Sequence, residues 1–513
     1  MKKFNILTCL FLITSSYPLF AQVVKQGNII FTSSFNSANS RAQWSGSPQW
    51  VSEGIGGGMC LFVNGEGMVH SIINLSPFKR MTLKFRCMVK ADGVTKPLQP
   101  YLGVKYMLHY KTPTTEIWQN EYDIYGTFNW KELKFTINVP YDATVGDISL
   151  GLQGSIGKVW FDSVSVSVIN VPISFKLKHK IGSNNDVTQF RGAMSSGDFK
   201  TDDIKTFGKD WNGNLFRWQL TPNQSERKSI ENNLDGYDHW LDHKLVDLDS
   251  ALVVCKQYGI KVVIDLHTVP GGQEKTGALN MFYNKDFNNH FIETWKRIAH
   301  RYKNNSSIWG YDLVNEPIEK GISIVGMDNA STQFRAVQTI RNIDPTSRII
   351  IEVGEGDSPG AFATFTPFNI SNLIYEVHMY EPHTYTHQGV LYPKTGIVYP
   401  GIIDGKYYDK NTLMNILKPV RDFQLMYHVP IYVGEFSAVR WAPGAAQYLD
   451  DCISIFEEYG WNWTYHAFRE WPGWSVEVEN GTSNTDSTIR ATQNTDRKKV
   501  LMKWFVKNKK IKN

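Results

Sequence analysis

From Phe190 to the C-terminus, short apolar runs alternate with longer stretches in which apolar residues recur at helical spacing. The candidate strands are Phe190–Met194, Asn214–Trp218, Lys261–Leu266, Ile308–Val314, Ile349–Val353, Leu373–Met379, Pro430–Gly434 and Trp461–Phe468. The helical patterns include His243–Tyr258, Phe287–Tyr302, Thr332–Ile343, Asn411–His428 and Ala445–Tyr459. Eight strand–helix units in succession predict an α/β fold, a closed (β/α)8 TIM barrel over residues 190–513. A doubly wound open sheet is the alternative, but the GxGxxG turn that would favour it does not follow the first strand.

Residues 23–170 follow a different pattern, with short, often alternating strands between Gly, Pro, Asn and Asp residues. Seven or more strands are expected, among them Gly27–Thr32, Met59–Val63, Met81–Val89, Leu102–Tyr110, Lys131–Val139, Ile148–Leu152 and Val159–Val168. This spacing predicts an all-β sandwich of the jelly-roll kind. The polar segment 171–189 is the expected connector to the barrel.

The first residues are organised like an export signal. Met1-Lys2-Lys3 precede the apolar run Phe4–Ile13, and small residues follow up to Ala21. This predicts a signal peptide over residues 1–21 and a secreted protein, whether periplasmic, extracellular or held at the cell surface. A lipoprotein anchor at Cys9 is the rival, although Cys9 lies inside the apolar run rather than after it. No other segment is apolar for long enough to predict a membrane span.

Charge and cysteine content narrow the classes of partner. The 513 residues have a formal net charge of only +5, which argues against a nucleic-acid-binding protein. The Lys-rich segment 496–513 is interpreted as a closing amphipathic helix rather than a membrane-surface helix.

Cys255 and Cys452 are expected to be free buried thiols, whereas a Cys60–Cys87 disulfide stays open because export permits one. No CxxC or CxxH pair suggests zinc, so neither a metal nor a cofactor is expected.

Polar residues gather where the candidate barrel strands end, and in such barrels the active site forms at the carboxyl ends of the strands. The strand ends are Arg217-Trp218, Asp265-Leu266-His267, Asn315-Glu316-Pro317, His378-Met379-Tyr380, Gly434-Glu435-Phe436 and Arg469-Glu470-Trp471. Two carboxyl groups that face one cleft without metal-ligand spacing suit glycoside hydrolysis, with one group protonated and the other ionised. Arg217 would keep Glu435 ionised by its charge, and Asn315 would offer an amide to a sugar hydroxyl.

Two motifs resemble glycoside hydrolase family 5, the cellulase family of clan A. Tyr311–Pro317 (YDLVNEP) is similar to the acid/base strand of that family, and Ile431–Phe436 (IYVGEF) is similar to its nucleophile strand. The resemblance covers roughly residues 186–507 and implies that Glu316 is the acid/base and Glu435 the nucleophile. The other active-site positions of the family fall on Arg217, His267, Asn315, His378 and Tyr380.

The end of strand eight departs from the family pattern, in which a Trp supports the sugar at the cleavage point. Either His466 takes that position or Trp471 reaches in from the loop, and Trp471 is the prediction. The loop 381–389 is expected to shape a subsite, with His387 as a further substrate-binding residue. Glu352, Glu355 and Glu470 are interpreted as bystanders or binders.

The resemblance implies a secreted, retaining, monomeric hydrolase that cleaves internal β-1,4 linkages of a plant-type polysaccharide, with cellulose or another β-glucan first. A mannan- or xylan-directed enzyme of the same family is the alternative, and a non-catalytic surface glycan-binding protein is a second one. The sandwich resembles carbohydrate-binding modules, a match shared by many functions. Trp44, Trp50, Trp118 and Trp130 are its candidate sugar platforms, and a purely structural module is the competing interpretation.

Overall fold

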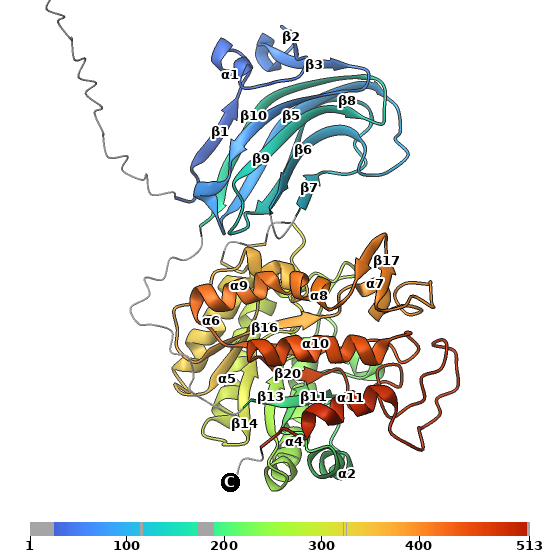
Figure 1. Ribbon diagram of the computed structural model, residues 1–513. Helices are drawn as coiled ribbons and strands as arrows, with labels where there is room; N and C mark the ends of the chain where they lie inside the picture. Colours follow the sequence, from blue (N-terminus) through green and yellow to red (C-terminus); the bar gives the residue numbers. More distant parts are fainter. Residues whose placement is uncertain (1–24, 113–115, 172–188, 322, 325, 510–513) are drawn as a thin grey trace, which may run out of the picture.

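A computed structural model describes residues 25–112, 116–171, 189–321, 323–324 and 326–509. The chain forms two bodies, an all-β unit from the N-terminal part and a barrel with surrounding helices from the C-terminal part (Figure 1). The predicted signal peptide and most of the predicted connector lie outside the described residues. Within those residues, no helix is long and apolar enough to cross a membrane.

The N-terminal unit is a sandwich of two antiparallel sheets. One sheet has the order β2 (Gln49–Val51), β3 (Cys60–Asn64), β10 (Lys158–Asn170), β5 (Thr82–Val94) and β8 (Gly126–Asn138), with β1 (Ile29–Ser33) also paired to β10. The other has the order β4 (Gly67–Asn74), β9 (Val145–Gln153), β6 (Gly103–Lys111) and β7 (Glu116–Asn120). Along β5, alternate residues such as Leu83, Phe85 and Val89 are fully buried, so the strand turns one face to a core shared by the two sheets.

The disulfide left open for Cys60 and Cys87 is absent, since both are free buried thiols. Strand β10 lies between β3 and β5, so the two cysteines stand on strands that are not neighbours. Two strand spacings amount to about 10 Å, beyond the reach of a disulfide. Cys255 and Cys452 are free and buried, as predicted.

The second unit is a closed eight-stranded parallel barrel, which confirms the predicted fold class. Its strands, in order, are β11 (Arg191–Ser195), β12 (Leu215–Gln219), β13 (Lys261–Asp265), β14 (Ile308–Asp312), β15 (Arg348–Glu352), β16 (Leu373–Met379), β19 (Ile431–Phe436) and β20 (Asn462–Tyr465). Every residue of β16 and β19 is buried, as expected for strands covered on both faces.

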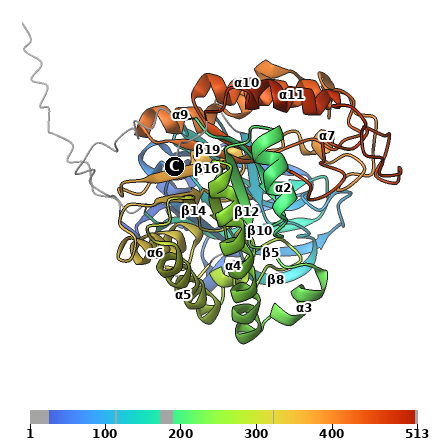
Figure 2. The same ribbon diagram turned by 90° about the horizontal axis from the view of Figure 1, so that it is seen from below.

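Helices surround the barrel, as the view from below shows (Figure 2). They are α2 (Thr201–Lys205), α3 (Gln224–Ile230), α4 (Leu234–Gln257), α5 (Lys285–Tyr302), α6 (Asn329–Arg341), α8 (Lys410–Ile416), α9 (Lys418–Tyr427), α10 (Ala445–Tyr459) and α11 (Asp496–Phe505). The single helix predicted over Asn411–His428 is wrong. Pro419 falls in the first turn of α9, where its missing N–H costs nothing, and the chain starts a second helix there.

The sandwich packs on the barrel through α9 and the segment Pro359–Ala363. Tyr141 donates its backbone N–H to the Ala363 carbonyl at 2.8 Å. Arg80 donates to the Phe362 carbonyl at 3.1 Å and lies over the rings of Phe423 and Tyr427. These contacts join the two units by hydrogen bonds and cation–π packing.

Candidate active site

The carboxyl ends of the barrel strands bring Glu316 and Glu435 together. One oxygen of each carboxyl group and a ring nitrogen of His378 lie within 4.8 Å of one another. Glu316 follows β14 in the left-handed region, at a φ of 45°, which is uncommon for a residue with a side chain. Its backbone N–H donates to Glu352 Oε2 at 2.6 Å, so a buried carboxyl group holds this turn. Sparsely populated backbone conformations of this kind persist where the surroundings fix them.

Arg217 on β12 is the fully buried centre of the site. Its Nη1 donates to Glu435 Oε1 at 2.7 Å, and its Nη2 donates to Asn315 Oδ1 at 3.0 Å. Its Nε donates to Asp312 Oδ2 at 2.8 Å, and its Nη2 also reaches Glu352 Oε1 at 3.0 Å. The planar, always charged guanidinium thereby fixes groups from β14, from the loop after β14, from β15 and from β19.

Glu435 on β19 is nearly enclosed and strongly held as a carboxylate. Besides Arg217, the Tyr380 hydroxyl donates to its Oε2 at 2.7 Å. Burial alone would raise the pKa of Glu435, but the charges of His378, His466 and Arg217 outweigh burial and hold the pKa well below its usual range. Glu435 therefore stays ionised in its buried position.

Glu316 has a different environment. Its side chain is 42% exposed, against 5% for Glu435, and its Oε1 lies 3.0 Å from His378 Nδ1. It therefore has direct access to solvent protons, while Glu435 has cations around it. Two carboxyl groups in such unlike surroundings can take two roles in one reaction.

Asn315 and His267 are each oriented by one hydrogen bond. Arg217 occupies the Asn315 carbonyl oxygen, so the amide NH2 is the group left for a hydroxyl. His267 Nδ1 lies 2.9 Å from Asp265 Oδ2, which leaves Nε2 as the nitrogen for a ligand. Both side chains thus have one polar group free of these orienting contacts.

The remaining predicted residues, His387 and Trp471, have different neighbours at the barrel mouth. His387, in the loop after α7 (His383–Thr386), has its ring 5.0 Å from that of Tyr380, and burial lowers its pKa to about 3. Trp471 packs on Trp441 and Trp474. His466, by contrast, lies 3.2 Å from Glu435, so His466 and not Trp471 is the residue after strand eight that touches this carboxylate.

Sequence reasoning set aside two carboxylates that the structure brings into the network. Glu352 contacts Arg217 and Glu316, and Glu470 contacts His466. Glu352, Arg217 and Glu316 come from different strands and loops, so no short motif contains them, whereas Glu470 lies only four residues after His466 in the same loop. Glu352 lies at the carboxyl end of a predicted strand just as Asp265 does, and this position was the sequence signal that could have placed Glu352 in the site.

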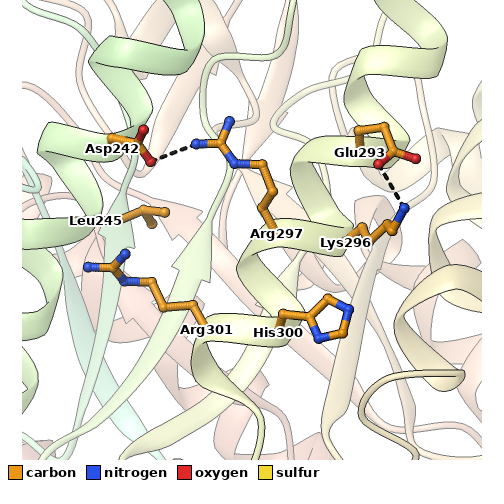
Figure 3. Close-up of a pocket in the computed structure, with 7 residues that line it drawn as sticks. All are labelled: Asp242, Leu245, Glu293, Lys296, Arg297, His300 and Arg301. Atoms are coloured by element: carbon orange, nitrogen blue, oxygen red, sulfur yellow. Dashed lines mark hydrogen bonds and ion pairs between the residues drawn. The ribbon is translucent and has the colours of Figure 1, made fainter.

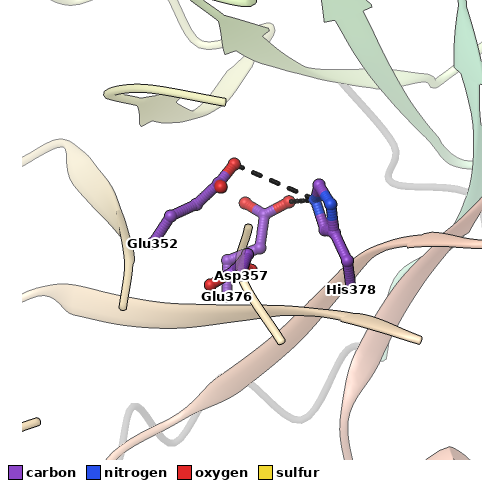
Figure 4. A group of neighbouring side chains, drawn as sticks. All are labelled: Glu352, Asp357, Glu376 and His378. Atoms are coloured by element: carbon purple, nitrogen blue, oxygen red, sulfur yellow. Dashed lines mark hydrogen bonds and ion pairs between the residues drawn. The ribbon is translucent and has the colours of Figure 1, made fainter. Parts of the chain in front are cut away.

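Below the mouth, Glu352, Asp357, Glu376 and His378 form a buried group whose polar atoms lie within 4.8 Å of one another (Figure 4). Such a set could hold a cation, but two positively charged side chains already contact it. Arg217 Nε and His378 Nε2 each lie 3.2 Å from Glu376 Oε1. Burial raises the pKa values of Glu352 and Asp357 well above their usual ranges. The donor set therefore favours bound protons over a metal ion.

We expect Asp357→Asn to become more stable relative to the parent as pH rises. The raised pKa means that protonated Asp357 stabilises the folded state fully at low pH, and that this contribution is lost as pH rises towards the folded-state pKa. Asn does not titrate and accepts the positive φ of this position. The difference in Tm should grow by about 2–4 °C between about pH 5 and pH 9 in calorimetry. A pH-independent difference would contradict a protonated Asp357.

A hollow of about 460 Å³ lies elsewhere, between α4 and α5 (Figure 3). Its lining consists of Asp242, Leu245, Glu293, Lys296, Arg297, His300 and Arg301. Arg297 pairs with Asp242 at 2.6 Å and Lys296 with Glu293 at 3.0 Å. All seven residues belong to the outer helices α4 and α5, so this hollow is separate from the candidate active site at the strand ends.

A parallel barrel whose mouth sets an ionised carboxylate beside a second, solvent-reachable carboxyl is the arrangement of a glycoside hydrolase. The family model for cellulase, glycosyl hydrolase family 5, matches residues 181–470, and the chain belongs to this family. The resemblance seen in the sequence is thus confirmed.

Individual relatives match about half of the chain or more. Endoglucanase C of Acetivibrio thermocellus is 26% identical over 263 residues, which cover 45% of this chain and 75% of that protein. Cellodextrinase A of Ruminococcus flavefaciens is 24% identical over 308 residues, 57% of this chain and 84% of that protein. A solved endoglucanase of the hyperthermophilic Thermotoga maritima is 19% identical with a TM-score of 0.48, covering 61% of this chain and 96% of that one.

Proposed function

We propose that the protein is a secreted endo-β-1,4-glycanase that acts with retention of configuration, with Glu435 as nucleophile and Glu316 as acid/base. The observation that supports this best is the Glu435 carboxylate, which receives hydrogen bonds from Arg217 and Tyr380 while one of its oxygens lies within 4.8 Å of a Glu316 oxygen. Retaining enzymes need carboxyl groups about 5–5.5 Å apart, whereas inverting enzymes leave about 6.5–9.5 Å for a water. The short separation favours retention.

In this mechanism, Glu435 attacks the anomeric carbon while Glu316 donates a proton to the departing oxygen. Glu316 then removes a proton from the water that releases the sugar from Glu435. Asn315 and His267 are proposed to bind sugar hydroxyls through their amide and Nε2 groups. The aromatic residues at the mouth, Trp471 and Tyr380, with His387, are proposed to shape the subsites.

Cellulose or another β-glucan is the first proposed substrate, because the matched relatives include an endoglucanase and a cellodextrinase. A mannan- or xylan-directed activity is the alternative within the family. A non-catalytic glycan-binding protein is disfavoured because both carboxyl groups and their hydrogen-bond partners are present. Export agrees with a polymeric substrate, which a cell must cut outside its membrane, and the monomeric state stays a prediction.

The test is a panel of carboxymethylcellulose, mixed-linkage β-glucan, mannan and xylan, scored by reducing ends and by viscosity, with Glu435→Gln as the blank. We expect viscosity to fall early on a β-glucan, as internal cleavage requires, and NMR of the first product to show the β-anomer. Release of the α-anomer would overturn retention. Binding without any release of reducing ends by the parent would overturn the enzymatic proposal.

A second proposed function is glycan binding by the sandwich. Trp118 on β7 is 55% exposed and stacks on His109 of β6 at 4.7 Å between ring centroids, with 14° between the planes. Trp44 is buried in the sandwich core, so it offers no platform. An exposed, flat ring supported by a second ring suits stacking on a sugar.

We expect Trp118→Ala to lower retention of the protein on insoluble polysaccharide about tenfold, the size of one lost aromatic contact. Hydrolysis of a soluble substrate should keep its kcat/KM, because Trp118 belongs to the other unit. Ile156→Ala removes another exposed apolar side chain, 64% exposed, from the sandwich and is the matched control. Unchanged pull-down by Trp118→Ala would leave the sandwich as a structural module.

A further inference from the structure

His466 follows β20 and stands between two carboxylates. Its Nδ1 lies 3.2 Å from Glu435 Oε2 and its Nε2 lies 3.3 Å from Glu470 Oε1. The side chain is 13% exposed, so water contributes little to its solvation. The family pattern has a neutral Trp near this point of the chain, and this protein has a titratable ring instead.

Each ring nitrogen of His466 faces a carboxylate oxygen, and this arrangement favours one protonation state of the ring. A neutral imidazole has one N–H and one lone pair, so one carboxylate would meet a lone pair. Only the imidazolium donates to Glu435 and Glu470 at once. The ring of Trp474 lies 5.6 Å away with 36° between the planes, a neighbour that favours a cation.

Glu470 is itself fixed from the opposite side. Gln219 on β12 donates its amide to Glu470 Oε2 at 2.6 Å, so Glu470 presents its other oxygen to His466. The Tyr380 hydroxyl contacts both His466 Nδ1 and Glu435 Oε2. The chain Gln219–Glu470–His466–Glu435 therefore runs from the wall of the barrel to the proposed nucleophile.

We propose that His466 is a positioning residue that, as an imidazolium clamped between Glu435 and Glu470, keeps the Glu435 carboxylate ionised and aimed together with Tyr380. This inference rests on the proposed function, because it gives His466 a task only if Glu435 is the nucleophile. His466 adds a cation to Arg217 and His378, and it lies 3.2 Å from Glu435 Oε2, whereas Arg217 pairs with Oε1.

The charged and titratable groups around His466 come from several elements, and the two carboxylates among them favour the charged ring. The groups are Glu435 on β19, His378 on β16, Tyr380 directly after β16, His387 after α7, and Glu470 in the loop after β20, with Arg217 and His267 behind the two carboxylates. Burial alone would lower the pKa of His466, but Glu470 and Glu435 raise it to about 10. His387 is neutral by contrast, since burial lowers its pKa to about 3.

The role proposed for His466 predicts a change in the acid limb of the pH profile of kcat/KM. Glu435 must be ionised to attack, and the acid limb of kcat/KM reports its pKa in the free enzyme. Losing a cation at 3.2 Å raises that pKa, so the limb should move to higher pH by about 1–2 units. A purely structural residue would lower the plateau and leave the limb in place.

The experiment compares His466→Gln and His466→Trp with the parent. Both variants remove the charge, and the second restores an aromatic ring, so a charge effect shifts the acid limb upward in both. His387→Gln is the matched control, because it removes a neutral imidazole from the same mouth and should leave the limb in place. An unshifted limb in both His466 variants overturns the inference.

Nitrogen-15 NMR of histidine-labelled enzyme gives a second readout that does not depend on activity. The signals lost in His466→Gln identify His466, and in the parent both of its nitrogens should be of the imidazolium type up to pH 8. In Glu470→Gln their titration midpoint should fall by a pH unit or more. A neutral His466 at pH 7 in the parent overturns the inference.

The failures of the two proposals are distinguishable. An active Glu435→Gln would remove the nucleophile assignment, and the role of His466 with it. An inactive Glu435→Gln, combined with an unshifted limb in the His466 variants, would overturn the inference alone.

Discussion

Replacing Glu435 by Gln is expected to lower kcat/KM on the best polysaccharide by at least about 10⁴-fold, in the range seen when covalent nucleophiles are removed. The amide of Gln cannot attack the anomeric carbon, and the substitution also leaves Arg217 without the carboxylate at 2.7 Å. Reducing-end release at saturating and at low substrate measures the loss. Circular dichroism and Tm establish that the variant is folded.

The control is Glu355→Gln, which neutralises an exposed carboxylate in the loop after β15 and should keep the parent activity. A sharper version uses Glu435→Ala with sodium azide, because azide can enter the space of the lost carboxylate. Attack from that side then gives a glycosyl azide of inverted configuration. Activity of Glu435→Gln within about tenfold of the parent would contradict the assignment.

The barrel was predictable because its strands are buried on both faces. In β15 and β19 an apolar run, Ile349–Ile351 and Ile431–Gly434, directly precedes a glutamate, and the sequence shows this change from core to mouth. The strands of the sandwich were harder to predict from the sequence. β2, β4 and β7 are not among the strands named from the sequence, and in β7 the alternation is short and half-exposed because the strand lies at the edge of its sheet.

The gathering of Glu316, Glu435 and Arg217 at one mouth was also predictable, since each lies at the end of a recognisable strand. The partners of these residues were not. Glu352 meets Arg217 across 135 positions of sequence, and only the closed barrel brings them within 3.0 Å. The contact of His466 with Glu435, and the packing of Trp471 on Trp441, depend on how the chain leaves β20. Sequence spacing does not contain that packing.

Glu316→Gln is expected to reduce activity in a way that depends on the leaving group. A sugar alcohol is a poor leaving group and needs a proton from Glu316, so kcat/KM on a β-glucan should fall by about 10³–10⁴-fold, as for loss of a general acid. A dinitrophenyl glycoside departs as a stable anion and needs no proton. Its kcat/KM, which reports attack by Glu435, should fall by less than about tenfold.

The second step distinguishes Glu316 from a residue that merely binds the sugar. Without a base, hydrolysis of the glycosyl-enzyme becomes slow, so the dinitrophenyl substrate should give a burst followed by a low kcat. Azide needs no base and should restore turnover with a product of retained configuration, the opposite of the Glu435→Ala product. The 42% exposure of Glu316 gives azide and water a route to this face. Equal losses on the polysaccharide and the dinitrophenyl substrate, with no azide effect, would assign Glu316 to binding and leave the proton transfer to another group.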